Sequence, residues 1–261
     1  MATKYPIILV HGVMLKDLWR LRAFGRIEQI LRSEGNTTFT ANHDGLGSIE
    51  TNAAQLKDYI LGVLDSTGAD KVNIIAHSKG GLDILEMIKS HNMGERVASV
   101  TFLSTPHKGS LIADKLYTLP RPIRGTLVFF LNFWYRIFGD KKPDALTVCR
   151  QLRTSPEGVE RLEGIASHDG IYMQSYSTTI ERGRDDFLMG IPFRIYRHFE
   201  DIPTDGMVSV ESAMYANYRG NCTDIPVSHS EIVDLMAKRS KKEKIYEFYK
   251  GLCRELSDMG F

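Results

Sequence analysis

Cysteine is scarce in this chain of 261 residues. The three cysteines, Cys149, Cys222 and Cys253, lie far apart and form neither a CxxC pair nor a spacing typical of a metal site. We therefore expect buried free thiols rather than a disulfide framework. One disulfide is the alternative if the protein is exported.

An excess of charge of one sign is also missing. Lys and Arg number 33 against 32 Asp and Glu, so the formal net charge is +1. Binding to nucleic acid needs a basic face, so we predict no nucleic-acid partner. The densest basic cluster, residues 238–242, lies between two apolar helical patterns and fits a solvated helix face. Nothing in the sequence predicts an oligomeric state.

Long apolar runs are missing as well. The apolar run at residues 7–10 is too short for the core of a signal peptide, and no small-residue cleavage site follows it. The sequence fits either a cytoplasmic protein or the mature form of a secreted one. The most apolar segment, residues 127–138, would span about 18 Å as a helix, whereas a bilayer core is about 30 Å thick.

What the sequence does contain is a regular alternation of apolar strands and amphipathic helices over its first hundred residues. Such an alternation implies a mostly parallel sheet with right-handed crossovers and helices on both faces, so the predicted fold class is α/β. Strands are predicted at residues 7–10, 37–40, 71–76 and 97–103, and helices around residues 24–31, 53–64 and 82–88.

The alternation stops after residue 103. Residues 111–170 contain no clear strand, so we interpret the chain as one domain, residues 1–261, with residues 111–170 inserted as a lid or cap. A fifth strand is predicted at residues 172–179 and a short one at residues 221–227. The pattern at residues 193–199 fits a strand or a helix, and a helix around residues 245–256 ends the chain.

Ser78 is the predicted nucleophile. It lies in Ala76-His77-Ser78-Lys79-Gly80-Gly81, where an apolar strand runs into a helix. A strained turn at that junction lifts a serine hydroxyl above the sheet edge, and small neighbours let strand and helix approach closely. The alternative is an ordinary strand–Gly-Gly–helix junction with a surface serine.

Acyl transfer also needs an oxyanion hole, formed by backbone N–H groups. Lys79, directly after the serine, is the first predicted donor. The second is Val13, because His11-Gly12-Val13 follows the first strand. Both residues would act through the main chain.

These motifs resemble those of the bacterial true lipases of the α/β-hydrolase superfamily, the triacylglycerol lipase family. The resemblance rests on three motifs in the same order, Val10-His11-Gly12, the Ser78 segment, and Ser104-Thr105-Pro106-His107-Lys108-Gly109-Ser110. It covers the first 115 residues well and the region from Asp205 to His229 moderately. It implies the α/β-hydrolase fold and a serine hydrolase that cleaves carboxylic esters.

His229 is the predicted base, because this fold orders its triad as Ser, acid, His and because His229 follows the last predicted strand. His91, His107, His168 and His198 are the weaker candidates. For the acid, Asp205-Gly206-Met207-Val208 resembles the segment that carries the catalytic acid in those lipases. Asp-Gly is also a common turn pair. Asp201 is the reserve, and Asp185, Asp186 and Asp224 compete less well.

Two metal sites that occur among these lipases have to be considered for this chain. Many of these lipases bind a structural calcium through an acid two residues after the catalytic histidine, where this chain has Glu231, although no second ligand is evident. Thermophilic relatives hold zinc near an Asn-x-Asp segment, which Asn42-His43-Asp44 matches without the insertion that follows it in them. We expect no zinc and no required cofactor, and a structural calcium stays open.

The aromatic run in residues 127–138 predicts a lid that covers the site in water and opens at a lipid surface. Its rings would then contact acyl chains, with Phe129, Phe130, Phe133 and Trp134 as the candidates. The alternative is a fixed cap helix.

The predicted activity is hydrolysis of lipid or acylglycerol esters through an acyl-enzyme on Ser78. The enzymatic alternative is an acyltransferase, thioesterase or phospholipase on the same scaffold. The non-enzymatic alternative is a catalytically silent α/β-hydrolase that binds a ligand.

Overall fold

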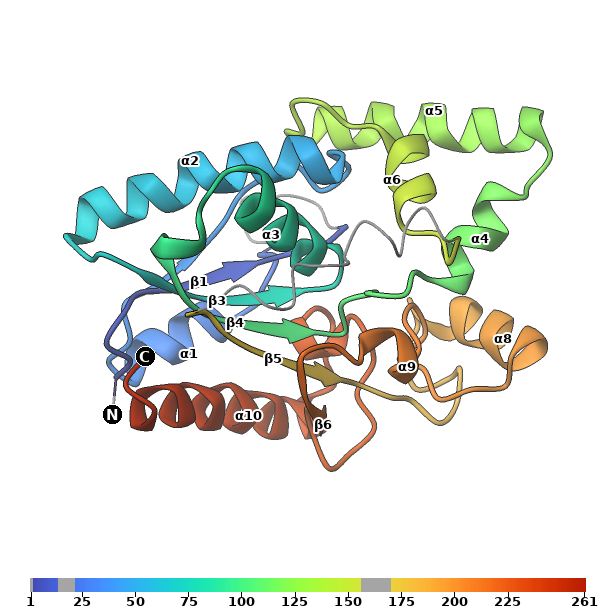
Figure 1. Ribbon diagram of the computed structural model, residues 1–261. Helices are drawn as coiled ribbons and strands as arrows, with labels where there is room; N and C mark the ends of the chain where they lie inside the picture. The colour runs from blue at the N-terminus through green and yellow to red at the C-terminus, as the bar shows by residue number, and fades with distance from the viewer. Residues whose placement is uncertain (1, 14–21, 156–169) are drawn as a thin grey trace.

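A parallel sheet forms the centre of the computed structural model, which describes residues 2–13, 22–155 and 170–261 (Figure 1). Within these residues the sheet has six strands in the order β2-β1-β3-β4-β5-β6, and every neighbouring pair is parallel. This confirms the predicted α/β class. The strands are β1 (Ile7–Val10), β2 (Thr38–Thr40), β3 (Val72–His77), β4 (Val97–Leu103), β5 (Tyr172–Ser177) and β6 (Asn217–Asn221).

The central strands are buried along their whole length, as continuous apolar runs predict. Helices α1 (Ile27–Ser33) and α10 (Arg239–Asp258) cover one face of the sheet, and α2 (Ile49–Thr67) and α3 (Lys79–Ser90) cover the other. The short 3-10 helix η1 (Gly94–Arg96) leads from α3 into β4. The two ends of the chain meet where the Lys4 amide donates to the Phe261 carbonyl.

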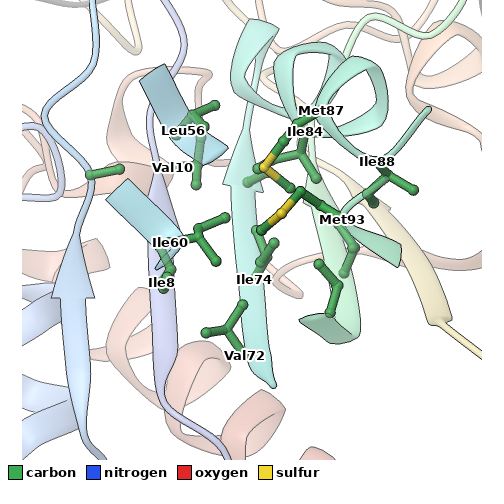
Figure 2. Packing of buried hydrophobic residues seen from close by; sticks show 14 of the residues in the cluster. Ile8, Val10, Leu56, Ile60, Val72, Ile74, Ile84, Met87, Ile88 and Met93 are labelled. Atoms are coloured by element: carbon green, nitrogen blue, oxygen red, sulfur yellow. The ribbon is translucent and has the colours of Figure 1, made fainter. Parts of the chain in front are cut away.

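One apolar core lies between the sheet and the helix pair α2 and α3 (Figure 2). Leu56 and Ile60 of α2 point toward Ile8 and Val10 of β1, and the helix α3 adds Ile84 beside them. These side chains have no exposed surface, and full burial of each stabilises the fold by about 1.5–3 kcal/mol. Ser48 caps the start of α2, and Gly68 ends it in a left-handed conformation, φ 68°.

Among the described residues, five further helices gather at the carboxyl ends of the strands (Figure 1). They are α4 (Leu111–Tyr117), α5 (Arg121–Ile137), α6 (Ala145–Gln151), α8 (Gly190–Phe199) and α9 (Val210–Ala213). Helices α4, α5 and α6 belong to the segment predicted as an insertion, of which residues 156–169 lie outside the described residues. The ambiguous pattern at residues 193–199 is helical.

The strand predicted at residues 221–227 is misplaced. The observed strand, β6, occupies Asn217–Asn221, and the residues between it and His229 form a loop. Alternate residues of β6 are exposed, since it is the edge strand, so it carries no continuous apolar run. Val227 misled the prediction because it is buried under α10 rather than paired in the sheet.

The cysteines are free, as predicted. Cys222 and Cys253 are buried and Cys149 is partly buried. Among the described helices, none has the length and apolar character needed to cross a bilayer.

Candidate active site

The turn between β3 and α3 holds Ser78 in a backbone conformation that side chains rarely adopt, with φ 56° and ψ −135°. Two glycines make the turn fit. A Cβ on Gly80 would lie 2.4 Å from the His11 carbonyl oxygen, and one on Gly81 would lie 2.2 Å from the Thr105 hydroxyl. The predicted elbow is therefore present, with Ser78 at the carboxyl edge of the sheet.

Ser78, His229 and Asp205 form one continuous chain of hydrogen bonds. The Ser78 hydroxyl lies 2.9 Å from Nε2 of His229, and Nδ1 of His229 lies 2.8 Å from Oδ2 of Asp205. The three residues come from separate loops, and 151 positions separate Ser78 from His229 along the chain. The His229 amide also donates to the Asp205 carbonyl at 3.1 Å, which fixes the two loops together.

Asp205 is kept ionised by its surroundings although it is buried. Burial alone would raise its pKa, but the charge and ring N–H of His229 and the amides of Val208 and Met207 outweigh burial and lower it. The Thr178 hydroxyl donates to the same oxygen that faces His229, at 3.2 Å. Asp205 is thus a charged acceptor aimed at the imidazole.

His77 packs against the ring of His229, with the two centroids 4.5 Å apart. Burial, followed by the charge that His229 can carry, lowers the pKa of His77 well below its usual value. His77 therefore stays neutral, and its uncharged ring packs against the imidazole of His229.

The loop after β1 lies directly against the elbow. A Cβ on Gly12 would lie 2.6 Å from the Ser78 Cβ and 3.0 Å from the Lys79 amide nitrogen, so only glycine permits this approach. Val13, the next residue, lines the same cavity as Ser78 and His229. The two predicted oxyanion donors, Val13 and Lys79, are thereby brought to one place.

The side chain of Lys79 turns away from this cavity into the protein. Its ammonium lies 2.7 and 2.9 Å from the two carboxylate oxygens of Asp83, and both residues are fully buried. Asn52 also donates to Asp83, at 2.9 Å. Burial raises the pKa of Asp83 to about 6, against the opposing effects of Lys79 and Asn52.

A second network joins the loop after β2 to the loop after α5. The Asp44 carboxylate accepts from the amides of Lys141 and Lys142, at 2.9 and 2.8 Å. In return, the Asp140 carboxylate accepts from the amides of Gly45 and Leu46, at 3.1 and 2.8 Å. We call this reciprocal pair of carboxylates, Asp44 and Asp140, the clasp. It fixes the carboxyl end of α5 to the core.

An apolar cavity leads from Ser78 and His229 to the underside of α5. Polar groups are few on its walls, which come mainly from α4, α5 and α6. The α5 residues that line it are Arg124, Leu127, Val128 and Leu131.

The aromatic residues predicted to contact substrate lie on the other side of α5. Phe129, Phe130, Phe133 and Trp134 are each about half exposed or more, between 49% and 64%, and are absent from the cavity wall. A helix with apolar residues on both faces accounts for the difference, because residue type alone does not say which face turns inward.

The weaker triad candidates lie elsewhere. Asp201 pairs with Arg197, and Asp224 pairs with Lys244 at 2.9 Å, both on the exposed surface. His107 is buried in a stack on Tyr215, His198 is exposed on α8, and His91 ends α3. Asp185 accepts a backbone bond from Arg182, and His168 lies outside the described residues.

Two acids, Asp186 and Glu231, bind the serines on either side of His229. Asp186 accepts hydrogen bonds from the hydroxyls of Ser228 and Ser230. Glu231 opens the short 3-10 helix η3 (Glu231–Val233), and its carboxylate accepts from the Ser228 amide at 3.1 Å and from the Lys241 ammonium at 2.6 Å. The serines on either side of His229 are thus anchored.

Protein groups bind the carboxylate of Glu231, the predicted calcium candidate. The Lys241 ammonium already neutralises its carboxylate, and no cluster of three or more His, Cys, Asp or Glu residues suited to a metal occurs in the described parts of the chain. In the Asn42-His43-Asp44 segment, His43 stacks on His11 at 4.1 Å and Asp44 belongs to the clasp.

Comparisons with known proteins agree with this architecture. The chain is 35% identical over 172 residues to a triacylglycerol lipase of Pseudarthrobacter phenanthrenivorans, which covers 59% of this chain and 52% of that protein. It is 26% identical to a triacylglycerol lipase of Pseudomonas fragi, over 99% and 98% of the two chains. The mature lipase of Bacillus licheniformis has a TM-score of 0.65 at 20% identity and covers 96% of this chain and 92% of its own.

The chain spans about half the length of the curated relatives that it matches at 35% identity. No protein-family profile matches it. The fold is that of an α/β-hydrolase, as predicted. The curated triacylglycerol lipases support the resemblance to the bacterial true lipases that the sequence motifs indicate.

Sequence reasoning missed the residues that support the site. Asp83 stands four residues after Lys79 on α3, a spacing that places the two on one helix face, and this signal was available. Thr178, Asn52 and Asp140 had no such signal, because their partners are distant in sequence.

Proposed function

We propose that the protein hydrolyses carboxylic esters through an acyl-enzyme on Ser78. The observation that carries this proposal is the hydrogen-bonded chain from Ser78 through His229 to Asp205, at the end of an apolar cavity. A serine hydroxyl attacks a carbonyl only when a neighbouring base takes its proton, and the imidazole lies at the distance that this transfer requires.

Each residue has a distinct task in the proposed reaction. His229 Nε2 takes the proton of Ser78 as its oxygen bonds to the ester carbonyl carbon, and then gives that proton to the departing alcohol. Asp205 stabilises the imidazolium that forms in between, and its lowered pKa keeps it charged for this task. Water, activated by His229 in the same way, then releases the acid and restores Ser78.

The negative oxygen that develops on the carbonyl is assigned to the amides of Val13 and Lys79. Support comes from Gly12, whose missing side chain lets this loop approach Ser78 and the Lys79 amide. The amino end of α3 adds a favourable dipole at the same point.

The substrate class that we propose is the lipid ester. The cavity wall is almost entirely aliphatic, with Leu127, Val128 and Leu131 above and Ile112 and Val148 beside them. Such a wall favours a long acyl chain, because each buried methylene contributes about 0.8 kcal/mol. The relatives named triacylglycerol lipases agree with this chemistry.

We further propose that α5 is a lid. Support comes from its two apolar faces: one covers the cavity and the other meets solvent. No residue of α5 is fully buried, so this helix packs less firmly than α2 and α3, which have many buried residues. Opening at a lipid surface would give both faces an apolar environment.

The nucleophile is tested with the Ser78→Ala variant on a soluble short-chain ester. We expect turnover to fall by at least about a thousandfold and labelling by a fluorophosphonate probe to disappear. Unfolding midpoints of the two proteins serve as the control for folding. Full activity in Ser78→Ala would falsify the mechanism.

The lid is tested with the double variant Phe129→Ser, Trp134→Ser. We expect a large loss on emulsified long-chain esters and little change on a soluble short-chain ester. Phe187→Ser, which removes a ring that is 90% exposed outside α5, is the matched control. Equal losses on both substrates would rule out interfacial opening.

A further inference from the structure

The outer face of α5 carries one continuous apolar stripe. Neighbouring rings touch along it, with centroids 5.6 Å apart for Phe129 and Phe130 and 5.8 Å apart for Phe133 and Trp134. Contiguous exposed apolar surface of this kind marks an interaction site, whereas single exposed residues do not. The stripe is made by Ile123, Phe129, Phe130, Phe133, Trp134 and Ile137.

Between Lys115 and Lys142 the exposed charged side chains are all basic, and the exposed acid Asp144 follows them at the start of α6. Neither Asp nor Glu occurs in the sequence from Lys115 to Gly139. Arg121 begins α5, Arg136 lies near its end, and both are exposed. Lys141 and Lys142 follow, with their amides bound in the clasp and their side chains exposed.

The acid that ends this basic stretch is withdrawn from the surface. Asp140 is buried, and the amides of Gly45 and Leu46 bind its two oxygens. Arg124 is also engaged, because it donates to the Tyr117 carbonyl. The surface charge of α5 therefore comes from cations at its two ends, Arg121 on one side and Arg136, Lys141 and Lys142 on the other.

We propose that the outer face of α5 docks onto an anionic phospholipid bilayer. Aromatic and aliphatic side chains enter the boundary between headgroups and acyl chains, and the cations at the helix ends bind lipid phosphates. This inference rests on the proposed function, since the inner face of the same helix covers the cavity of Ser78. Docking therefore places the lipid surface against α5, the helix that covers the cavity of Ser78.

The charges favour this occupant over two others. A neutral lipid surface would take the apolar stripe but leave Arg121, Arg136 and the two lysines without partners. A second copy of the chain would bring like charges together, because a twofold interface places the same patch on both sides. An anionic bilayer satisfies both the stripe and the cations.

The experiment measures binding of the Ser78→Ala protein to vesicles, so that lipid is not hydrolysed. Phosphatidylcholine vesicles are compared with vesicles of phosphatidylcholine and phosphatidylglycerol by flotation. We expect binding to the anionic vesicles to be at least about tenfold tighter and to weaken as salt is raised. With Trp19 replaced by Phe, the emission of Trp134 should shift to shorter wavelength on the anionic vesicles.

Charge variants assign the effect to α5. The double variant Arg121→Gln, Arg136→Gln should lose about thirtyfold in affinity for the anionic vesicles, at roughly fivefold for each cation removed. Lys238→Gln, Arg239→Gln makes the same change of charge at the start of α10 and should bind as the parent does. Both variants, made also with Ser78 intact, should hydrolyse a soluble short-chain ester at the parental rate.

Three outcomes would overturn the proposal. Equal binding to neutral and anionic vesicles would show that the cations have no role, and binding to neither would exclude docking. A dimer in analytical ultracentrifugation that Phe129→Ser, Trp134→Ser dissociates would assign the stripe to a second copy. Hydrolysis of the soluble ester is scored separately, so loss of docking and loss of the catalytic mechanism are told apart.

Discussion

Lys79 and Asp83 form an ion pair that has no exposed surface, with the ammonium 2.7 Å from one carboxylate oxygen and 2.9 Å from the other. The pair lies one turn apart at the start of α3. The amide nitrogen of Lys79 lies close to Gly12 while its side chain reaches inward, so the pair holds the first turn of the helix in place behind Ser78.

A double-mutant cycle measures what this pair contributes. Asp83→Leu leaves a buried ammonium without its partner and should lower the free energy of unfolding by about 3–5 kcal/mol. Lys79→Met, Asp83→Leu removes both charges and should recover most of that loss, as measured by urea denaturation. Lys79→Met alone completes the cycle. If the double variant loses as much free energy of unfolding as Asp83→Leu and Lys79→Met lose together, the two side chains are not coupled.

Gly80, two residues after Ser78, should tolerate no side chain. Gly80→Ala places a methyl group 2.4 Å from the His11 carbonyl, so the elbow or the loop of Val13 must move. We expect hydrolysis of a soluble ester to fall by at least about a hundredfold, because small displacements at a catalytic site have this cost. Gly62→Ala is the matched control.

A Cβ on Gly62 meets nothing within 4 Å on α2. That change should preserve activity and stabilise the fold by about 0.5–1 kcal/mol. Parental activity in Gly80→Ala would contradict the tight packing of the elbow.

His107 should make the fold sensitive to acid. Burial lowers its pKa from 6.5 to about 3, and its ring stacks on Tyr215 with centroids 4.1 Å apart. Between these two pH values the unfolded chain binds a proton that the folded chain does not. The free energy of unfolding therefore falls as the pH falls from 6.5 toward 3, by on the order of 5 kcal/mol in full.

His107→Phe keeps an aromatic ring and removes the titrating group. Its stability should vary less between pH 6.5 and pH 4 than that of the parent, in denaturation curves taken across this range. His198→Phe, at an exposed position on α8, should leave the parental slope unchanged. An identical slope in His107→Phe would assign the acid sensitivity to other groups.

The clasp should protect two amides from exchange. Asp140→Ala leaves the amides of Gly45 and Leu46 without their acceptor, at a cost of about 1–3 kcal/mol. We expect faster hydrogen exchange at these amides by mass spectrometry. Asp144→Ala removes only the cap of α6 and should leave their exchange as it is, and unchanged exchange in Asp140→Ala would contradict the role of the clasp.

The sequence by itself determined the features that depend on neighbouring residues in the chain, namely the buried strands and the turn at Ser78. Continuous apolar runs located β1, β3 and β4, because strands buried on both faces need apolar residues at every position. The elbow at Ser78 was predictable for a similar reason: the glycines after it are required by close approach. The pairing of Asp205 with His229 remained a prediction from chain order and resemblance.

Tertiary structure decided everything that depends on contacts between distant segments. Asp140 binds amides more than ninety positions away, and no periodicity records such a partner. The edge strand β6 was misplaced because exposure breaks its apolar pattern. The inward face of α5 was likewise undetermined, since both faces are apolar and only the packed cavity beneath Leu127, Val128 and Leu131 selects one of them.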